Sequence, residues 1–513
     1  MSMSSQGTRR RLSWLLLLLI LGAWLRVAGI GTSSLWSDEA FSWAVADLAR
    51  THDPLEVAYG PVVTEDVHPP LYMLALAAWM RIAGDSEPAL RILSALLSIL
   101  TLPALYLLGR ALFGQRAGGL ALLLGVLSPF QIVYAQEARQ YALVVCLAAW
   151  MLVGMADMLR GRRRGAMLFV LTGVMGLYTL HFFGLLLAAT HLWPLLNPAA
   201  RRHWRLWLVA DAMIGLLYLP QLPVTLAQFQ AISGSYWPDA PSIASPMATS
   251  AFLLYATTLP RDALSMIAIV LIISVLIIGG VDIGRHAPKP VRAMWLTTTV
   301  ILYAPMFAVL ATTLARTAIY VDRSFSPFAP LLLILLAGGL AYAHRPSPTP
   351  LLAAGIMILM IIGAVRHLAL PDPGKPPFRD IAAELTAPSD VSAMPVILLH
   401  DGVLLPLHYY APDVAARAQV VDMGERSWIT SPAIWPALGI TRTSRAELED
   451  WLSAYRGDMR LIVTGNLEPP EIQTFIRLRE GSLGACTERD AVDYPPFVTV
   501  FTFTCGQPGS GQE

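Results

Sequence analysis

A series of apolar stretches between residues 12 and 368 constrains this sequence more than any other feature. A helix that crosses a bilayer needs about 20 apolar residues, and eleven stretches have roughly that length. They lie at about 12–30, 88–109, 117–134, 138–159, 166–181, 182–197, 204–222, 262–284, 292–314, 326–343 and 350–368. Only 14% of the 513 residues are charged, against about 25% in a soluble domain. The sequence therefore predicts a mainly α-helical, polytopic membrane protein with about eleven transmembrane helices.

Basic residues divide the connections between these stretches into two kinds, because Lys and Arg collect in the cytoplasmic loops of membrane proteins. With a cytoplasmic N-terminus, every second connection is basic, and these connections hold Arg110, Arg116, Arg160, Arg162, Arg163, Arg164, Arg201, Arg202, Arg205, Arg285, Lys289, Arg292, His344 and Arg345. The odd number of spans then places the C-terminus outside. We expect a multi-pass protein of the plasma membrane with an extracytoplasmic C-terminal domain.

The apolar run at 70–83 is excluded from this map. About 14 residues are too few for a span and suit an interfacial helix. Counting the run would also place every later basic cluster outside. We therefore expect residues 31–87 to form one extracytoplasmic loop on the membrane, with interfacial helices near 38–50 and 70–83.

Two domains are expected, because the composition changes after the last apolar stretch. Residues 1–369 form the transmembrane domain, residues 370–506 a soluble α/β domain, and residues 507–513 a disordered tail. The patterns in the second domain predict helices at 378–386, 445–455 and 471–479 and strands at 395–400, 460–465 and 497–505. Cys486 and Cys505 lie within it, and an oxidising compartment would favour a disulfide between them; in a cytoplasmic domain they would be two free thiols.

The first candidate site is the pair Asp38 and Glu39, which follows the first span directly. Ionisable residues at the rim of a membrane are costly unless they meet water, a partner or a substrate. In one interpretation Ser37 is the N-cap of a helix and the two carboxylates only complement its dipole. In the other, one carboxylate is a general base that deprotonates an acceptor hydroxyl.

The second candidate site is the segment 134–141, Tyr-Ala-Gln-Glu-Ala-Arg-Gln-Tyr, at the outer end of the third span. Glu137 and Tyr141 are four residues apart and would share a helix face. Arg139 suits a phosphate, because its planar guanidinium binds two oxygens at once. The alternative is that Glu137 and Arg139 are ordinary interfacial charges.

Further candidates lie on the same predicted outer face. His68 precedes two prolines and Tyr72, and Arg323 opens the tenth span. The weaker substrate-binding candidates are Tyr72, Tyr141, His181, Trp237 and Tyr320, since single His and aromatic residues at span ends often have only interfacial roles. The net charge of +1 does not favour a nucleic-acid partner, and the sequence contains no glycine-rich phosphate loop or dinucleotide motif.

In their order and spacing, Asp38-Glu39, His68-Pro69-Pro70-Leu71-Tyr72, the segment 136–141 and the Tyr-Thr-Leu-His-Phe-Phe-Gly segment at 178–184 resemble the GT-C superfamily of membrane glycosyltransferases. The most similar branch comprises protein O-mannosyltransferases, lipid A aminoarabinose transferases and galacturonosyltransferase-like bacterial proteins, which are glycosyltransferase families 39 and 83. The resemblance covers about residues 12–345. It implies a GT-C fold and inverting transfer of a sugar from a polyprenyl-phosphate carrier to an extracytoplasmic glycan, lipid or protein.

By this resemblance, Asp38 is the base, Glu39 and Glu137 shape the site, and Arg139, His68 and Arg323 hold the carrier phosphate. Aminoarabinose transferases carry a lysine where His68 stands, and a neutral imidazole would add no charge. No cofactor is expected. A divalent metal on Asp38, Glu39, His68 and Glu137 is possible but not favoured, because enzymes with monophosphate carriers resemble metal-free systems.

Three alternatives stay open. A transporter or flippase of a lipid-linked saccharide would usually show repeats and broken helices near the midplane of the membrane. A polysaccharide ligase or polymerase with a diphosphate-linked donor would not need the early acidic pair. An inactive homologue would use its C-terminal domain only to bind partners.

Overall fold

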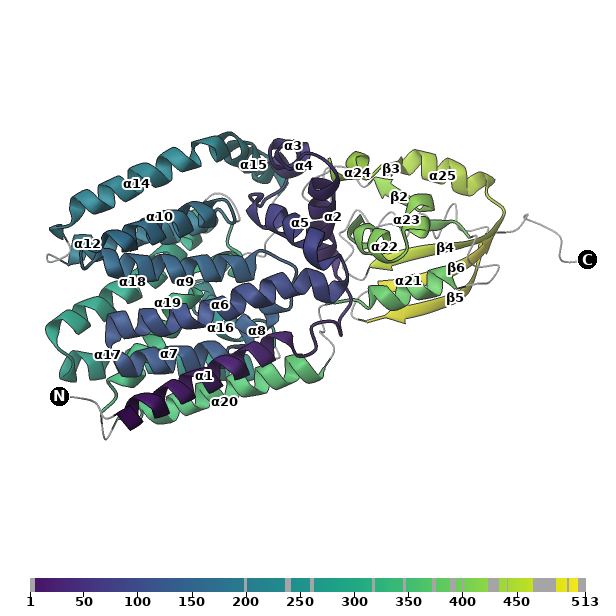
Figure 1. The fold of residues 1–513 in the computed structure, drawn as a ribbon. Helices are drawn as coiled ribbons and strands as arrows, with labels where there is room; N and C mark the ends of the chain where they lie inside the picture. The colour runs from purple at the N-terminus through teal and green to yellow at the C-terminus, as the bar shows by residue number, and fades with distance from the viewer. Residues whose placement is uncertain are drawn as a thin grey trace, which may run out of the picture. The chain divides into compact units, whose positions relative to one another are not determined.

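The computed structural model of the protein describes residues 5–197, 201–235, 241–258, 263–315, 319–344, 347–370, 375–387, 394–398, 401–422, 433–440, 442–464, 486–495 and 498–505. The chain forms two compact units, whose elements are labelled in Figure 1. The first unit contains Met1–Ile30, His68–Ala75 and Pro88–Leu370, and the second contains Gly31–Val67, Leu76–Glu87 and Pro371–Glu513. The loop after the first span therefore packs mainly with the C-terminal part of the chain, although most of the membrane region separates the two in sequence.

The first unit is a bundle of apolar helices. Its helices are α1 (Ser5–Val27), α6 (Glu87–Phe113), α7 (Gln115–Leu127), α8 (Pro129–Ala135), α9 (Tyr141–Met158), α10 (Arg163–Leu177), α11 (Phe183–Thr190), α12 (Leu192–Leu196), α14 (Trp204–Tyr218), η1 (Leu219–Gln221), α15 (Leu222–Ser235), α16 (Ser245–Tyr255), α17 (Ala263–His286), α18 (Lys289–Ala315), η2 (Asp322–Phe328), α19 (Ala329–Ala341) and α20 (Thr349–Ala369). Within the described residues, seven helices are long and apolar enough to cross a membrane, or eight if the bent pair α7–α8 is one span. The predicted class, a mainly α membrane protein with a small α/β domain, is confirmed. The predicted count of eleven spans is not.

A bend separates α7 from α8, where the sequence predicted one continuous span. The two helices meet at 53°. The reason is Pro129, which has no backbone N–H and forces the preceding Ser128 out of the helical conformation; Ser128 has φ −63° and ψ 114°. The Ser128 hydroxyl then caps α8 by accepting a bond from the backbone nitrogen of Gln131. The short helix α8 after the bend leads directly into the segment that carries Glu137 and Arg139.

A buried arginine ties three helices of the bundle together. Arg26 of α1 is fully buried. Its guanidinium donates to Ser98 Oγ on α6 at 2.8 Å and to the carbonyls of Gly22 and Gly125 at 2.9 Å each. Polar groups in a membrane interior have to find protein partners because lipid offers none. Arg26 is therefore satisfied inside the bundle and is a structural residue.

The second unit begins with short helices from the predicted outer loop. They are α2 (Ser37–Thr51), α3 (Pro54–Tyr59), α4 (Pro61–Thr64) and α5 (Leu71–Ala83), and the first residues of α5 belong to the first unit. The helices expected near 38–50 and 70–83 correspond to α2 and α5. The apolar stripe of α2, formed by Phe41, Ala44, Val45 and Leu48, is buried, as an amphipathic helix requires.

Within its described residues, the C-terminal region of the second unit is built on a six-stranded sheet. Its elements are α21 (Phe378–Thr386), β1 (Val396–Leu398), η4 (Asp401–Val403), α22 (Leu404–Tyr410), α23 (Pro412–Arg417), β2 (Gln419–Asp422), α24 (Ile434–Ala437), β3 (Arg442–Ser444), α25 (Arg445–Ala454), β4 (Gly457–Thr464), β5 (Cys486–Tyr494) and β6 (Val498–Cys505). The strand order is β3-β2-β1-β4-β6-β5. The first four strands are parallel to one another, whereas β6 pairs antiparallel with both β4 and β5.

Helix α25 packs against this sheet, and a disulfide links two of its strands. Leu448 and Leu452 of α25 are buried against Ile397, Met459 and other sheet residues. Cys486 and Cys505 stand opposite each other in the β5–β6 ladder and form a disulfide. The helix predicted at 471–479 and the tail at 507–513 lie outside the described residues.

Candidate functional site

The segment 136–140 of the first unit interrupts the helical path between α8 and α9. Glu137, Arg139 and Gln140 are all buried there. The predicted shared helix face of Glu137 and Tyr141 is wrong, because α9 begins only at Tyr141. Non-helical backbone is tolerated at the membrane only where protein or a water-filled cavity surrounds it. Buried charged side chains on such a segment are typical of a functional site.

The bundle itself holds this segment in place. The amide nitrogen of Gln136 donates to the carbonyl of Ala28 at 2.8 Å and to that of Leu25 at 3.3 Å, and its amide oxygen lies 3.2 Å from His367 Nε2. The Gln136 side chain thus donates to backbone carbonyls at and just after the C-terminal end of α1. Segment 136–140 is fixed to both α1 and α20.

Arg139 is connected to Tyr72 through a serine. The Ser94 hydroxyl of α6 donates to the carbonyl of Arg139 at 3.4 Å and shares a hydrogen bond of 3.0 Å with the Tyr72 hydroxyl. Tyr72 is completely buried. The rings of Tyr134 and Tyr141, which flank the segment, lie 4.7 Å apart. The structure thus brings together three of the predicted residues, Tyr72, Arg139 and Tyr141, at segment 136–140.

His68 and His181 are joined by a glutamine that the sequence analysis did not single out. Gln228 on α15 donates to the backbone carbonyl of His68 at 2.8 Å, and its amide oxygen accepts from His181 Nε2 at 2.9 Å. Gln228 is fully buried. The polar glutamine within an apolar run was the only sequence signal for this role, and nothing in its neighbours indicates its partners.

Tyr320 and Asp322 bind a helix that was not predicted. The Thr249 hydroxyl of α16 donates to Asp322 Oδ1 at 2.5 Å and shares a bond of 2.8 Å with the Tyr320 hydroxyl. Arg323 is the second residue of η2 and is half-buried. Helix η2 packs against both α16 and α9. The start of the tenth predicted span therefore lies beside α9, whose first residue is Tyr141. Trp237 lies outside the described residues.

Gln140 has polar atoms that the described part of the protein does not satisfy. Its side chain is 1% exposed, and neither its amide oxygen nor its amide nitrogen has a hydrogen-bond partner. Leaving a buried polar group unpaired costs about 1–3 kcal/mol. A polar ligand, such as a sugar hydroxyl, would satisfy this amide.

Asp38 and Glu39 lie in the second unit, in the first turn of α2. The interpretation of Ser37 as an N-cap is wrong: Trp36 occupies that position, and the Ser37 hydroxyl donates to the carbonyl of Gly402 at 2.6 Å. Glu39 is fully buried and pairs with Lys375, whose Nζ lies 3.5 Å from Glu39 Oε2. Asp38 is half-buried. The two neighbouring carboxylates thus have different surroundings.

The sequence allowed a metal site but did not favour one. Among the described residues, no three His, Cys, Asp or Glu side chains gather into a group that could hold a metal ion.

Comparisons with known proteins agree with this architecture. Residues 67–205 match the family model described as dolichyl-phosphate-mannose-protein mannosyltransferase. The crystal structure of ArnT from Cupriavidus metallidurans bound to undecaprenyl phosphate is similar, with a TM-score of 0.59 and 14% identity, over 96% of this chain and 98% of that one. The archaeal oligosaccharyltransferase AglB from Archaeoglobus fulgidus, in complex with an inhibitory peptide and a dolichol-phosphate, gives a TM-score of 0.57 at 11% identity, over 96% of this chain and 80% of that one. The chain has the GT-C fold of membrane glycosyltransferases.

This result confirms the resemblance seen in the sequence. The match at 67–205 begins beside His68 and includes Tyr72, Glu137, Arg139, Tyr141 and His181. Asp38, Glu39 and Arg323 lie outside it, so their roles depend on the fold and on their own chemistry. A comparison with curated proteins finds no significant match.

Proposed function

We propose that this GT-C protein transfers a sugar from a polyprenyl-phosphate carrier to an acceptor on the extracytoplasmic face of the plasma membrane. The observation that most supports this proposal is the fold. Over 96% of the chain, it is similar to the fold of a protein bound to undecaprenyl phosphate. The family model that matches residues 67–205 supports the same donor class, since its description names a dolichyl-phosphate-linked sugar. The acceptor is a hydroxyl of a glycan, a lipid or a protein.

In the proposed reaction the acceptor oxygen attacks the anomeric carbon from the side opposite the phosphate. The bond between this carbon and the phosphate oxygen breaks, and its electron pair stays on the released polyprenyl phosphate. Attack from the opposite side inverts the configuration at the anomeric carbon, and Asp38 takes the proton of the acceptor hydroxyl. A positioned general base contributes about 10²–10⁴ to the rate.

Positive charge is needed where the phosphate leaves. Arg139, His68 and Arg323 are the proposed phosphate ligands, and Arg139 contributes most because it is always charged and buried, where its field is weakly screened. Glu137 and Glu39 shape the charge around the site, and Gln140 binds a hydroxyl of the transferred sugar. No metal or cofactor enters this scheme.

The test uses membranes that contain the protein and its natural acceptor. These membranes are supplied with a panel of labelled undecaprenyl-phosphate-linked hexoses and pentoses, and both sugar incorporation and released undecaprenyl phosphate are measured. Asp38→Asn should lower transfer by about 10²–10⁴. Retained transfer by a folded Asp38→Asn variant would remove Asp38 from the mechanism.

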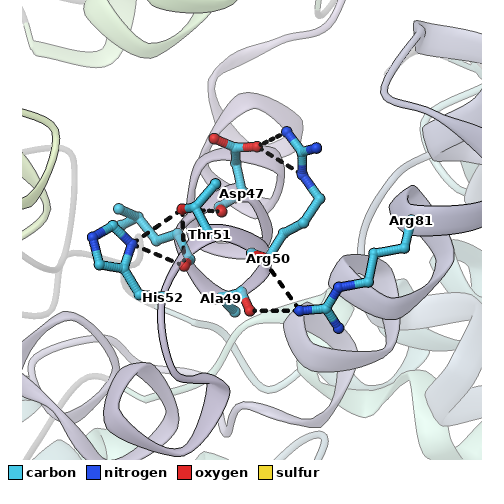
Figure 2. Close-up of polar contacts among 7 residues, drawn as sticks. Asp47, Ala49, Arg50, Thr51, His52 and Arg81 are labelled. Carbon is cyan, nitrogen blue, oxygen red and sulfur yellow. Dashed lines mark hydrogen bonds and ion pairs between the residues drawn. The ribbon is translucent and has the colours of Figure 1, made fainter.

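Asp47 provides the matched control on the same helix. Figure 2 shows its carboxylate paired with Arg50 near the end of α2, and Arg81 of α5 bound to the carbonyls of Ala49 and Arg50. Arg81 donates to these two carbonyls at 3.4 and 3.3 Å. The Asp47–Arg50 pair is partly exposed, and such pairs contribute about 0–1 kcal/mol. Asp47→Asn should therefore transfer sugar almost normally.

The same measurement separates the competing functions. A transporter would move the lipid-linked sugar without releasing undecaprenyl phosphate. A ligase with a diphosphate-linked donor would ignore the monophosphate panel. Incorporation with equal release of undecaprenyl phosphate is expected only from the proposed transferase.

A further inference from the structure

The residues around Asp38 are held by the C-terminal domain. We call residues 34–39 the Asp38 segment and residues 375–505 the C-terminal domain; both belong to the second unit. Within the described residues, the C-terminal domain contacts Ser34, Leu35, Trp36, Ser37 and Glu39. These contacts come from three separate parts of the domain: the residues before α21, the start of α21, and the region of η4 and α22.

Tyr410 is the first of these contacts. Its hydroxyl accepts a hydrogen bond from the backbone nitrogen of Leu35 at 2.7 Å and donates to the carboxylate of Glu87. Arg379 binds the other oxygen of Glu87 and donates to the carbonyl of Gly31 at 3.2 Å. Burial raises the pKa of Tyr410, and Glu87 raises it further, so the hydroxyl keeps its proton at neutral pH. The backbone entering α2 is thus anchored at a defined point.

Lys375 and Gly402 hold the other end of the segment. Lys375 Nζ lies 3.5 Å from the buried Glu39 carboxylate and 5.7 Å from the centre of the Trp36 ring. The Gly402 carbonyl accepts the Ser37 hydroxyl bond. Buried charges need a partner, and a cation over an indole face adds attraction. Contacts therefore lie on both sides of Asp38 in the sequence.

We infer that the C-terminal domain is a positioning device for the proposed base: Tyr410, Gly402 and Lys375 fix the Asp38 segment and thereby aim the Asp38 carboxylate. This inference rests on the proposed function. Asp38 is the second residue of α2, so the direction of its side chain follows from the backbone that these contacts hold. A displacement of about 1 Å at a catalytic group can cost on the order of 10² in rate.

Two mild substitutions test the inference. Tyr410→Phe removes the hydroxyl that Leu35 binds but keeps the ring, and Ser37→Ala removes the bond to Gly402. Each should lower kcat by on the order of tenfold, with the KM for the lipid-linked sugar unchanged, because donor binding is not assigned to this segment. Lys375→Met should lower kcat as well, and Lys375→Arg should retain most of it because the charge is kept.

Tyr409→Phe is the matched control. Tyr409 precedes Tyr410 on α22, and its hydroxyl donates to the carbonyl of Asp85 at 2.8 Å. This control removes a hydroxyl from the same helix. The lost bond also joins the C-terminal domain to the predicted outer loop, but it does not involve the Asp38 segment. Its kcat should match that of the unchanged protein.

Hydrogen–deuterium exchange of peptides covering residues 31–42 gives a readout that does not need turnover. Tyr410→Phe should speed exchange in this peptide, and Tyr409→Phe should not, with equal melting temperatures. Unchanged exchange in Tyr410→Phe would overturn the holding contact, and faster exchange with normal kcat would overturn the positioning role. Absence of turnover in the unchanged protein would reject the proposed function instead, and exchange alone would then decide whether the contact holds the segment.

Discussion

Glu137 and Asp38, two carboxylates of the proposed site, lie on two short polar segments. These two segments are held in different ways. Segment 136–140 is fixed by its own bundle: Gln136 binds carbonyls at the end of α1, and Ser94 of α6 binds the carbonyl of Arg139. The Asp38 segment is fixed by residues that come after the last helix of the bundle, such as Tyr410 and Lys375.

This difference separates two tasks. The bundle buries Arg139 among helices that also contribute apolar surface, which suits a carrier with a lipid tail and a charged phosphate. The C-terminal domain holds the segment with the proposed base, so it can influence the acceptor side of the reaction without altering the donor side. The comparison predicts that changes at the first segment affect donor use, whereas changes in the C-terminal domain affect turnover or stability.

Among the changes that test this comparison, the largest effect is expected at Arg139. Arg139→Gln keeps a polar side chain but removes the charge that would stabilise the departing phosphate. Losing one such donor costs about 10²–10³ in kcat, so transfer from undecaprenyl-phosphate sugars should fall by that factor. Arg164→Gln is the control, because Arg164 is 75% exposed and pairs with Asp157. Normal transfer by Arg139→Gln would show that the bundle segment does not serve the donor.

The disulfide should have a large effect on stability and little on chemistry. Cys486 and Cys505 are 19 residues apart, and closing a loop of about this length contributes roughly 3 kcal/mol. The double variant Cys486→Ser/Cys505→Ser should therefore lower the melting temperature of the C-terminal domain, followed by tryptophan fluorescence. Its kcat at low temperature should stay normal, because the contacts to the Asp38 segment come from α21, α22 and their flanking residues.

Cys146→Ser is the control for the loss of sulfur. Cys146 is a buried free cysteine on α9, so this substitution leaves the sheet untouched. A double variant at 486 and 505 that melts like the unchanged protein would contradict a stabilising role of the disulfide. A large fall in kcat at low temperature would instead link the far edge of the sheet to the Asp38 segment.

The sequence predicted the fold class and the polar segments because both depend on local patterns. Apolar length indicates membrane helices, and the amphipathic pattern of α2 indicates its buried face. The same pattern logic missed α16, since its eleven residues are too few to be recognised as a span. It also wrongly placed Glu137 and Tyr141 on one helix face, because the two residues have helical spacing even where the chain is not helical.

Partners distant in sequence could not be predicted. Gln228 is a single amide in an apolar helix, and its bonds to His68 and His181 exist only after α15 packs. Tyr410 and Lys375 have ordinary sequence neighbours, and nothing near them indicates Leu35 or Glu39. For a single sequence, such pairs are set by tertiary packing and have no local signal.

Gln136→Leu should have a smaller effect than the Arg139 change. It removes the bonds to the Leu25 and Ala28 carbonyls, and buried groups left unpaired cost about 1–3 kcal/mol. The melting temperature of the bundle should fall, and the KM for the lipid-linked sugar should rise because segment 136–140 loosens. Gln115→Leu, which removes a bond between α7 and the Tyr106 hydroxyl of α6, should leave KM unchanged. An unchanged KM in Gln136→Leu would separate the anchoring of the segment from donor use.

The smallest expected effect is a change in stability with pH that depends on the titration of His408. This residue packs beside Trp43 of α2, with ring centres 5.8 Å apart. Burial lowers the pKa of His408 below its usual 6.5, and the charge of Asp47 opposes this shift. The unfolded chain therefore binds more protons between the folded pKa and about 6.5, so the stability of the second unit should fall as pH drops through that window. His408→Phe should flatten the dependence of the melting temperature on pH, and Asp47→Asn should steepen it. An identical pH dependence in all three proteins would show that His408 titrates in the folded unit as it does in the unfolded chain.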